Sequence, residues 1–147
     1  MIDVKEPLRA SYYGLLNNRI VIGSSTIPIA DSVQKLGTNT PETYVIMTTQ
    51  NGNSQNTHHS WMSEETMTLD IVTRGTRVAK STVDRIASQI FTLMFPRPNQ
   101  FSNLDQSIIS IINVRVTDDR EIVYSVSGGQ NVTRRLITFT QLVTQAS

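Results

Sequence analysis

The stretch that decides the fold runs from Pro41 to Pro96 and contains TYVIMTTQ (residues 43–50), TMTLDIVT (66–73) and STVDRIASQIFTLMF (81–95). Residues 43–50 are rich in Val, Ile, Tyr and Thr with little alternation, which predicts a strand buried on both faces. In residues 66–73, apolar residues alternate with polar ones, which predicts a half-buried strand. We expect these two strands to pair antiparallel, with a polar projecting loop at about residues 50–63 between them.

Residues 81–95 predict one amphipathic helix. Ser81 is a suitable N-cap, and Asp84 follows three residues later like the acid of a capping box. Pro96 and Pro98 then end the helix. The apolar residues recur at helical spacing and form one stripe: Val83, Ile86, Ala87, Ile90, Phe91 and Met94.

Shorter elements flank this central stretch. Towards the N-terminus we expect a helix at residues 8–16, a brief strand at 19–22, an extended segment at 27–31 and a loop at 32–40. Towards the C-terminus we expect strands at 108–116, 122–126 and 132–143, separated by a turn at Asp118-Asp119 and a loop at Gly128-Gly129. The sequence therefore predicts a single α+β domain over residues 1–147, a mostly antiparallel sheet packed against one main helix, plus a short N-terminal helix.

Composition excludes several classes of function. The chain has 147 residues, with 13 basic and 12 acidic side chains, so its net charge of +1 lacks the basic footprint of a sequence-specific DNA-binding domain. It has no cysteine, which removes disulfides, thiolate nucleophiles and cysteine zinc sites. The beginning of the chain does not resemble a signal peptide, and no apolar run is long enough to span a bilayer. We expect no export and no membrane association.

No group of residues predicts a catalytic, cofactor-binding or metal site. His58 and His59 are adjacent, so on an extended chain their side chains point to opposite sides and rarely share one metal ion. Asp70 alternates with apolar neighbours, so we expect a carboxylate that faces solvent or another subunit. Gly128-Gly129 is followed by a strand instead of the helix that phosphate binding requires.

Two features suggest contacts with other proteins. Trp61 stands alone in a polar segment, and its ring either folds back onto the sheet or anchors a protein–protein contact. Arg134-Arg135 is a small basic pair near the start of the last strand. It is either a solvated strand end or a partner for a carboxylate or phosphate on another molecule.

The order of the elements resembles one group of proteins. PETYVIM (residues 41–47) opens the first long strand, a polar hairpin loop and LDIVT (69–73) follow, the helix begins after Ser81, and RRLITF (134–139) lies in the last strand. This order is similar to that of the tail-terminator (tail-completion) proteins of tailed bacteriophages and, by extension, of head-to-tail connector ring proteins.

The resemblance implies a structural virion protein of the tail or neck, made in the host cytoplasm, with no enzymatic activity and no cofactor. Its partners would be other copies of itself, in a ring of six or more subunits, and the adjoining connector and tail proteins. Double-stranded DNA would pass through the channel without sequence-specific binding. Alternatives are a tail-tube or baseplate subunit, a small enzyme that uses His58 and His59, and a monomeric adaptor. The expected interface residues are Asn53, Gln55, His58, His59, Trp61, Arg134 and Arg135.

Overall fold

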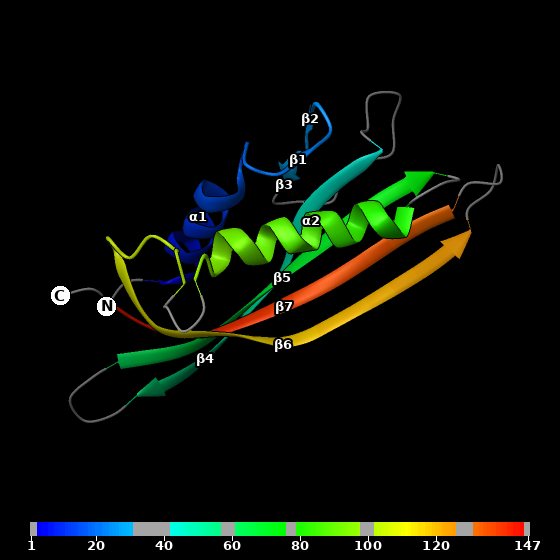
Figure 1. The fold of residues 1–147 in the computed structure, drawn as a ribbon. Helices are drawn as coiled ribbons and strands as arrows, with labels where there is room; N and C mark the ends of the chain where they lie inside the picture. Colours follow the sequence, from blue (N-terminus) through cyan, green and yellow to red (C-terminus); the bar gives the residue numbers. More distant parts are fainter. Residues whose placement is uncertain are drawn as a thin grey trace.

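The computed structural model describes residues 3–30, 42–56, 61–75, 79–97, 102–125 and 131–145. These residues form two helices and seven strands (Figure 1). Their bounds are α1 Lys5–Leu16, β1 Val21–Ile22, β2 Ser25–Thr26, β3 Ile29–Ala30, β4 Thr43–Asn56, β5 Trp61–Gly75, α2 Ala79–Met94, β6 Ile109–Ser125 and β7 Asn131–Gln145. Long strands and few helices confirm the predicted α+β class.

Five strands form the main sheet in the order β3-β4-β5-β7-β6. Neighbouring strands are antiparallel, as predicted for β4 and β5, except that β3 runs parallel to β4. The last strand in the chain, β7, lies between β5 and β6, so β6 forms one edge of the sheet. Residues 21–26 form a separate small hairpin, β1–β2, which turns at Gly23 with a φ of 62°.

The core lies between the two helices and one face of the sheet. Leu8, Tyr12 and Leu16 of α1 are fully buried there, which confirms the predicted N-terminal helix. The predicted stripe of α2 packs against the same face, with five of its members buried and Phe91 half-buried. The rings of Tyr12, Phe91 and Phe95 all surround Phe139 of β7, at centroid distances of 6.0, 6.1 and 6.4 Å. Phe139 therefore joins both helical regions to the sheet.

The start of α2 differs from the prediction. The helix already includes Ala79 and Lys80, so Ser81 lies inside it instead of serving as the N-cap. Ala and Lys are strong helix formers, which accounts for the earlier start. The carboxylate of Asp84 is engaged by Arg135 of β7 instead of taking part in a cap. The C-terminal end is as predicted, because α2 stops at Met94, two residues before Pro96.

Two predicted breaks in the sheet are wrong. Residues 51–56 and 61–63, expected in a polar loop, belong to β4 and β5 and pair with each other. Asp118-Asp119, expected to form a turn, lies inside the 17-residue strand β6. A register shift between Val116 and Asp118 accommodates this segment, since a bulge keeps the strand paired where the local sequence is irregular. The predicted loops at 32–40 and at Gly128-Gly129 lie outside the described residues.

The strands are much longer than the helix that covers them. At 1.5 Å per residue the 16 residues of α2 span about 24 Å, whereas at 3.4 Å per residue β6 spans about 58 Å. The sheet therefore extends well beyond α2, as Figure 1 shows for the β4–β5 hairpin and for β6. None of the helices in the described part of the chain is both long enough and apolar enough to cross a membrane.

Candidate interaction surface

The residues predicted for an interface occupy different environments. Asn53 is exposed on β4 opposite Glu64, and Gln55 lies in the same strand opposite Met62. His58 and His59 lie outside the described residues. Trp61 is the first residue of β5, half-buried, and packs against the main core, while its carbonyl oxygen accepts a hydrogen bond from the hydroxyl of Thr144 at 2.8 Å. The ring thus lies on the sheet, and its part in a protein contact stays a prediction.

Arg134 binds a buried acid on the face of the sheet away from α2. Its Nε donates to Asp70 Oδ1 at 3.3 Å, and its Nη2 forms an ion pair with Oδ2 of the same carboxylate. This hydrogen bonding raises the pKa of the Arg134 guanidinium. The prediction that Asp70 faces solvent or a subunit is wrong, because its side chain is fully buried within this chain. Alternation did assign the correct face, but a small apolar cluster of Tyr44, Ile46, Val72 and Val132 occupies that face too.

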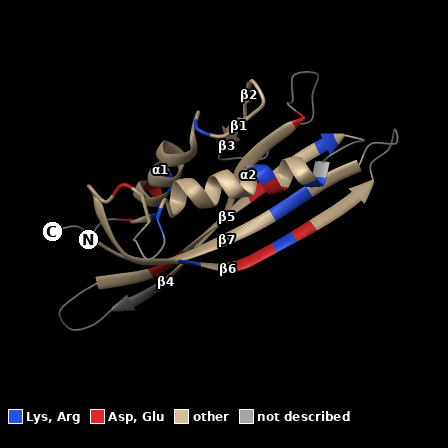
Figure 2. Cartoon of the chain, in the orientation of Figure 1, with Lys and Arg blue, Asp and Glu red and all other residues tan. Residues whose placement is uncertain are grey.

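Arg135 makes a second ion-pair network on the opposite face. Its Nη1 donates to Asp84 Oδ1 of α2 at 3.0 Å, and its Nε and Nη2 donate to the two oxygens of Asp119 in β6 at 2.9 and 2.8 Å. The hydrogen bonds from Arg135 lower the pKa of the Asp119 carboxyl. Arg135 of β7 therefore links α2 to the edge strand β6 through ion pairs with both. Both residues of the Arg134-Arg135 pair form ion pairs within the chain, so neither is a solvated strand end. Figure 2 shows the basic segment of β7 in blue beside the acidic segments of β6 in red.

Strand β6 gathers most of the exposed large apolar side chains. Within the described part of the chain it is the last strand of the sheet and hydrogen-bonds only to β7. From Asn113 to Ser125 almost every one of its residues is exposed, on both faces. The exposed large apolar residues on this strand, or just before it, are Ile108, Ile112, Val116, Ile122, Val123 and Tyr124. They lie on both faces of the sheet, with Val116 and Val123 on one face and Ile122 and Tyr124 on the other, and so many exposed apolar residues on one strand suggest an interaction site.

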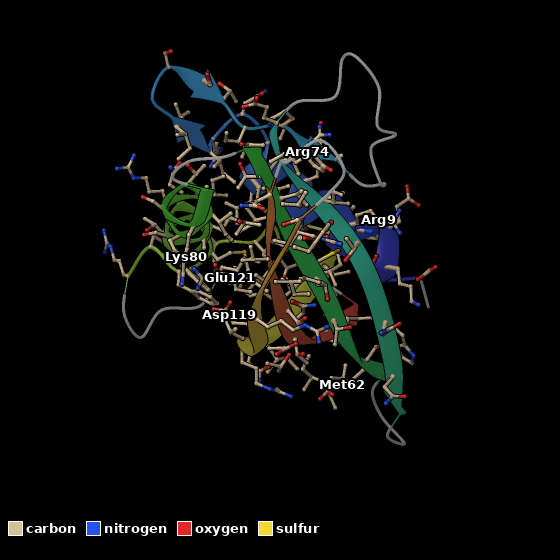
Figure 3. All side chains as sticks on the ribbon, turned by 90° about the vertical axis from the view of Figure 1, so that its right-hand side faces the viewer. Arg9, Met62, Arg74, Lys80, Asp119 and Glu121 are labelled. Atoms are coloured by element: carbon tan, nitrogen blue, oxygen red, sulfur yellow. The ribbon has the colours of Figure 1, made fainter. Side chains whose placement is uncertain are left out.

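The charges of β6 are largely satisfied within the chain. Arg115 pairs with Glu64 of β5 at 3.4 Å, and Arg120 pairs with Asp118 at 3.5 Å. Asp119 is held by Arg135. Glu121 makes no ion pair with any other residue of the described ranges. Asp119 and Glu121 lie on the side of the sheet that carries α2 (Figure 3).

A groove runs beside the exposed strand. It has a volume of about 390 Å³ and is lined by Asp84, Ser88, Phe91, Thr92 and Phe95 of α2 and its C-terminal end, together with Arg135 of β7. Val116 and Val123 of β6 are paired with Phe139 and Thr133 of β7, so their side chains share the face of the sheet on which this groove lies. The groove and the α2-facing side of β6 therefore form one partly apolar surface.

A buried polar network joins α1, β5 and β7 within the described part of the chain. Tyr12 Oη donates to Gln141 Oε1 at 2.6 Å, and Gln141 Nε2 donates to the carbonyl oxygen of Glu65 at 2.9 Å. Burial raises the pKa of the Tyr12 phenol. The Glu65 side chain accepts a hydrogen bond from Ser63 at 2.7 Å through one oxygen, while its other oxygen has no hydrogen-bond partner. Among the residues that the structure describes, no group of His, Asp or Glu side chains could hold a metal ion.

The sequence contained a signal for the edge strand that the prediction did not use. Charged residues occupy both faces of the middle of β6, at Arg115, Asp118, Asp119, Arg120 and Glu121. Natural sheets place charges in this way on edge strands, because a strand in the centre of a sheet would bury them. If residues 115–121 are interpreted as an edge strand, their charges do not require a turn at Asp118-Asp119.

Comparison with known proteins shows a shared fold. No protein-family model matches the chain, and no curated protein matches it. Among solved structures, the fold is similar to that of a chain in the "Virion of native gene transfer agent (GTA) particle", with a TM-score of 0.56 and 13% sequence identity. The match covers 97% of this chain and 92% of that chain. The fold of this chain is therefore similar to that of a virion chain over almost the full length of both.

Proposed function

We propose that this chain is a structural virion protein of a tailed phage-like particle, a subunit of a ring at the head-to-tail connector or at the top of the tail tube. The observation that carries the proposal is the likeness to a virion chain over almost the full length of both chains. The order of elements that resembles tail-terminator proteins supports the finer assignment. The function would be assembly and not catalysis.

The open edges of the sheet support self-association. An exposed strand edge presents unpaired backbone N–H and C=O groups and is a liability in a monomer. Pairing between two different edges of identical subunits is a heterologous contact, which closes into a ring when its rotation divides a full turn. Strand pairing across subunits would thus satisfy the unpaired backbone groups of both edges and hold the ring together.

The charge distribution suits a channel through which DNA slides. Affinity for a duplex comes mainly from basic side chains that neutralise phosphates. The net charge here is +1, and Arg115, Arg120, Arg134 and Arg135 are all engaged by carboxylates of the same chain. A ring of such subunits would surround double-stranded DNA without binding it tightly.

The proposal is tested by the mass and shape of the purified protein. Light scattering over a concentration series would be combined with electron microscopy of the largest species. We expect closed rings with a central hole, and the measured mass would give the number of subunits. Open tubes would instead favour a tail-tube subunit, and a species that stays monomeric both alone and with its connector and tail neighbours would contradict the proposal.

A further inference from the structure

We propose that the outer edge of β6 in one copy pairs antiparallel with the free edge of β4 in a second copy, so that one sheet continues from subunit to subunit. This inference deepens the proposed function, since it names the surface and the partner. Only the closure of the subunits into a ring rests on that function. The pairing of β6 with β4 between two copies can be tested independently of ring closure.

The first argument is that the two edges of the sheet are both available. Among the described residues, β6 hydrogen-bonds only to β7 on one side. On the other side, and within the same residues, the pairing of β3 with β4 is confined to Val45 and Ile46. From Asn51 to Asn56, β4 pairs with β5 alone within the described part of the chain, whereas the side chain of Gln50 is hydrogen-bonded to α1. These six residues give a free edge of about 20 Å at 3.4 Å per residue, which fits within the roughly 58 Å of β6.

The second argument is strand direction. β4 is antiparallel to β5, β5 to β7, and β7 to β6. Three reversals leave β6 running opposite to β4. A second copy placed in the same orientation beside β6 therefore presents its β4 antiparallel to β6, which is the more favourable of the two ladder geometries.

The third argument is charge, and it favours β4 over a second β6. The segment 115–121 carries two arginines and three acids, so two copies of β6 placed side by side would bring surplus carboxylates together. Like charges directly opposite each other destabilise a strand pair. Residues 51–56 of β4 carry no charge and are Asn, Gly, Ser and Gln. A side-chain amide both donates and accepts hydrogen bonds, so these residues can bind arginines as well as carboxylates such as that of Glu121.

The fourth argument is the apolar surface on both sides of the β6 edge. Ile122 and Tyr124 line one face, and Val116 and Val123 line the other beside the groove at Phe91 and Phe95. A strand added along β6 removes apolar surface from water on both faces at once. Burial of apolar surface is favourable roughly in proportion to the area removed from water.

Cysteine cross-linking tests the pairing directly, because the chain has no cysteine of its own. Asn53→Cys on β4 would be mixed with each of Asn113→Cys, Thr117→Cys and Glu121→Cys on β6, all at exposed positions. A disulfide requires the two Cα atoms to approach within about 7 Å. We expect one of the three mixtures to give a mixed disulfide dimer, several-fold above the control, and the position that reacts would give the register.

The control is Val21→Cys mixed with the same β6 variants, since Val21 is 42% exposed and belongs to neither edge. Disulfides formed only between two copies of a β6 variant would overturn the inference in favour of a two-fold contact. A mixed product no more abundant than the control would overturn it as well. Cross-linked chains that grow into open filaments would support the pairing and contradict the ring.

A pair of valine variants provides a second measurement. Val123→Lys adds a charge to the proposed contact, and Val21→Lys adds the same charge at a similarly exposed site elsewhere. We expect Val123→Lys to abolish assembly while its urea unfolding midpoint stays within error of wild type, and Val21→Lys to assemble normally. Equal assembly by both variants would overturn the inference.

Discussion

Strands β6 and β7 lie side by side and pair along nearly their whole lengths, yet their apolar residues have opposite environments. Ile137, Phe139 and Val143 of β7 are fully buried, whereas Val116 and Val123 of β6, on the same face of the sheet, are 41% and 60% exposed. Both strands are rich in β-branched and aromatic residues. The difference comes from position, because β7 lies under the helices and β6 lies beyond them. Apolar residues that stabilise the fold are thus distinguishable from those available to a partner.

The largest expected difference between the two strands is at Phe139. Phe139→Ala removes the ring that contacts Tyr12, Phe91 and Phe95 and leaves a cavity. We expect the free energy of unfolding to fall by about 3–5 kcal/mol, measured by urea denaturation at a concentration where the protein is monomeric. Val123→Ala in β6 is the matched control and should change it by less than about 0.5 kcal/mol. Equal losses would contradict the assignment of the two strands.

The neighbouring arginines of β7 offer a smaller contrast. Arg134→Met leaves the buried carboxylate of Asp70 without its partner, so we expect a loss of about 3 kcal/mol in the free energy of unfolding. Arg135→Met leaves Asp84 and Asp119 at partly exposed positions, where water replaces the lost contacts, and should cost less than about 1 kcal/mol. The melting curves of the two variants measure these losses in stability. A larger loss for Arg135→Met would contradict the prediction and show that the ion pairs of Arg135 stabilise the fold more than the pair of Arg134 with Asp70.

The smallest expected effect is the pH dependence of the contact between β6 and β7. The pKa of Asp119 is lowered in the folded protein, so its contribution to stability is complete above the unfolded pKa of about 4 and is lost as pH falls through the folded value. The stability gap between wild type and Asp119→Asn should therefore be constant from pH 5 to pH 7 and shrink below about pH 4.

Denaturation at a series of pH values measures this gap, with Asp118→Asn as the control. Asp118 pairs with Arg120 through side chains that are both more than half exposed, so its gap should be smaller at every pH. A gap for Asp119→Asn that widens towards low pH would contradict the assigned pairing with Arg135.

Local patterns in the sequence predicted the segments in which the spacing of apolar residues identifies the buried face. The apolar run at Tyr44–Met47, the alternation at Met67–Ile71 and the helical stripe ending before Pro96 all fold as expected. Each of these segments contains, within a few residues, the information on which face is buried. Local reasoning was therefore sufficient for the central segments of β4 and β5 and for the apolar stripe and C-terminal end of α2.

The missed features depend on residues far apart in the chain. Asp119 remains in a strand because Arg135 binds it from β7, although two adjacent aspartates are typical of a turn. Residues 51–56 have low strand propensity and are held extended by their pairing with β5. Asp70 is buried because Arg134, 64 residues later, neutralises it. The position of β7 between β5 and β6 has no local signature at all.

The contact between Tyr12 and Gln141 has a consequence for the order of folding. These residues are 129 positions apart, yet their hydrogen bond is buried under α1, and the Tyr12 ring also packs on Phe139. Closing so long a loop is entropically costly and slow, so contacts of this range form late. During synthesis α1 leaves the ribosome before the strand that completes its docking site exists. Although α1 is made before α2, it should thus be among the last elements to dock, once β7 lies between β5 and β6.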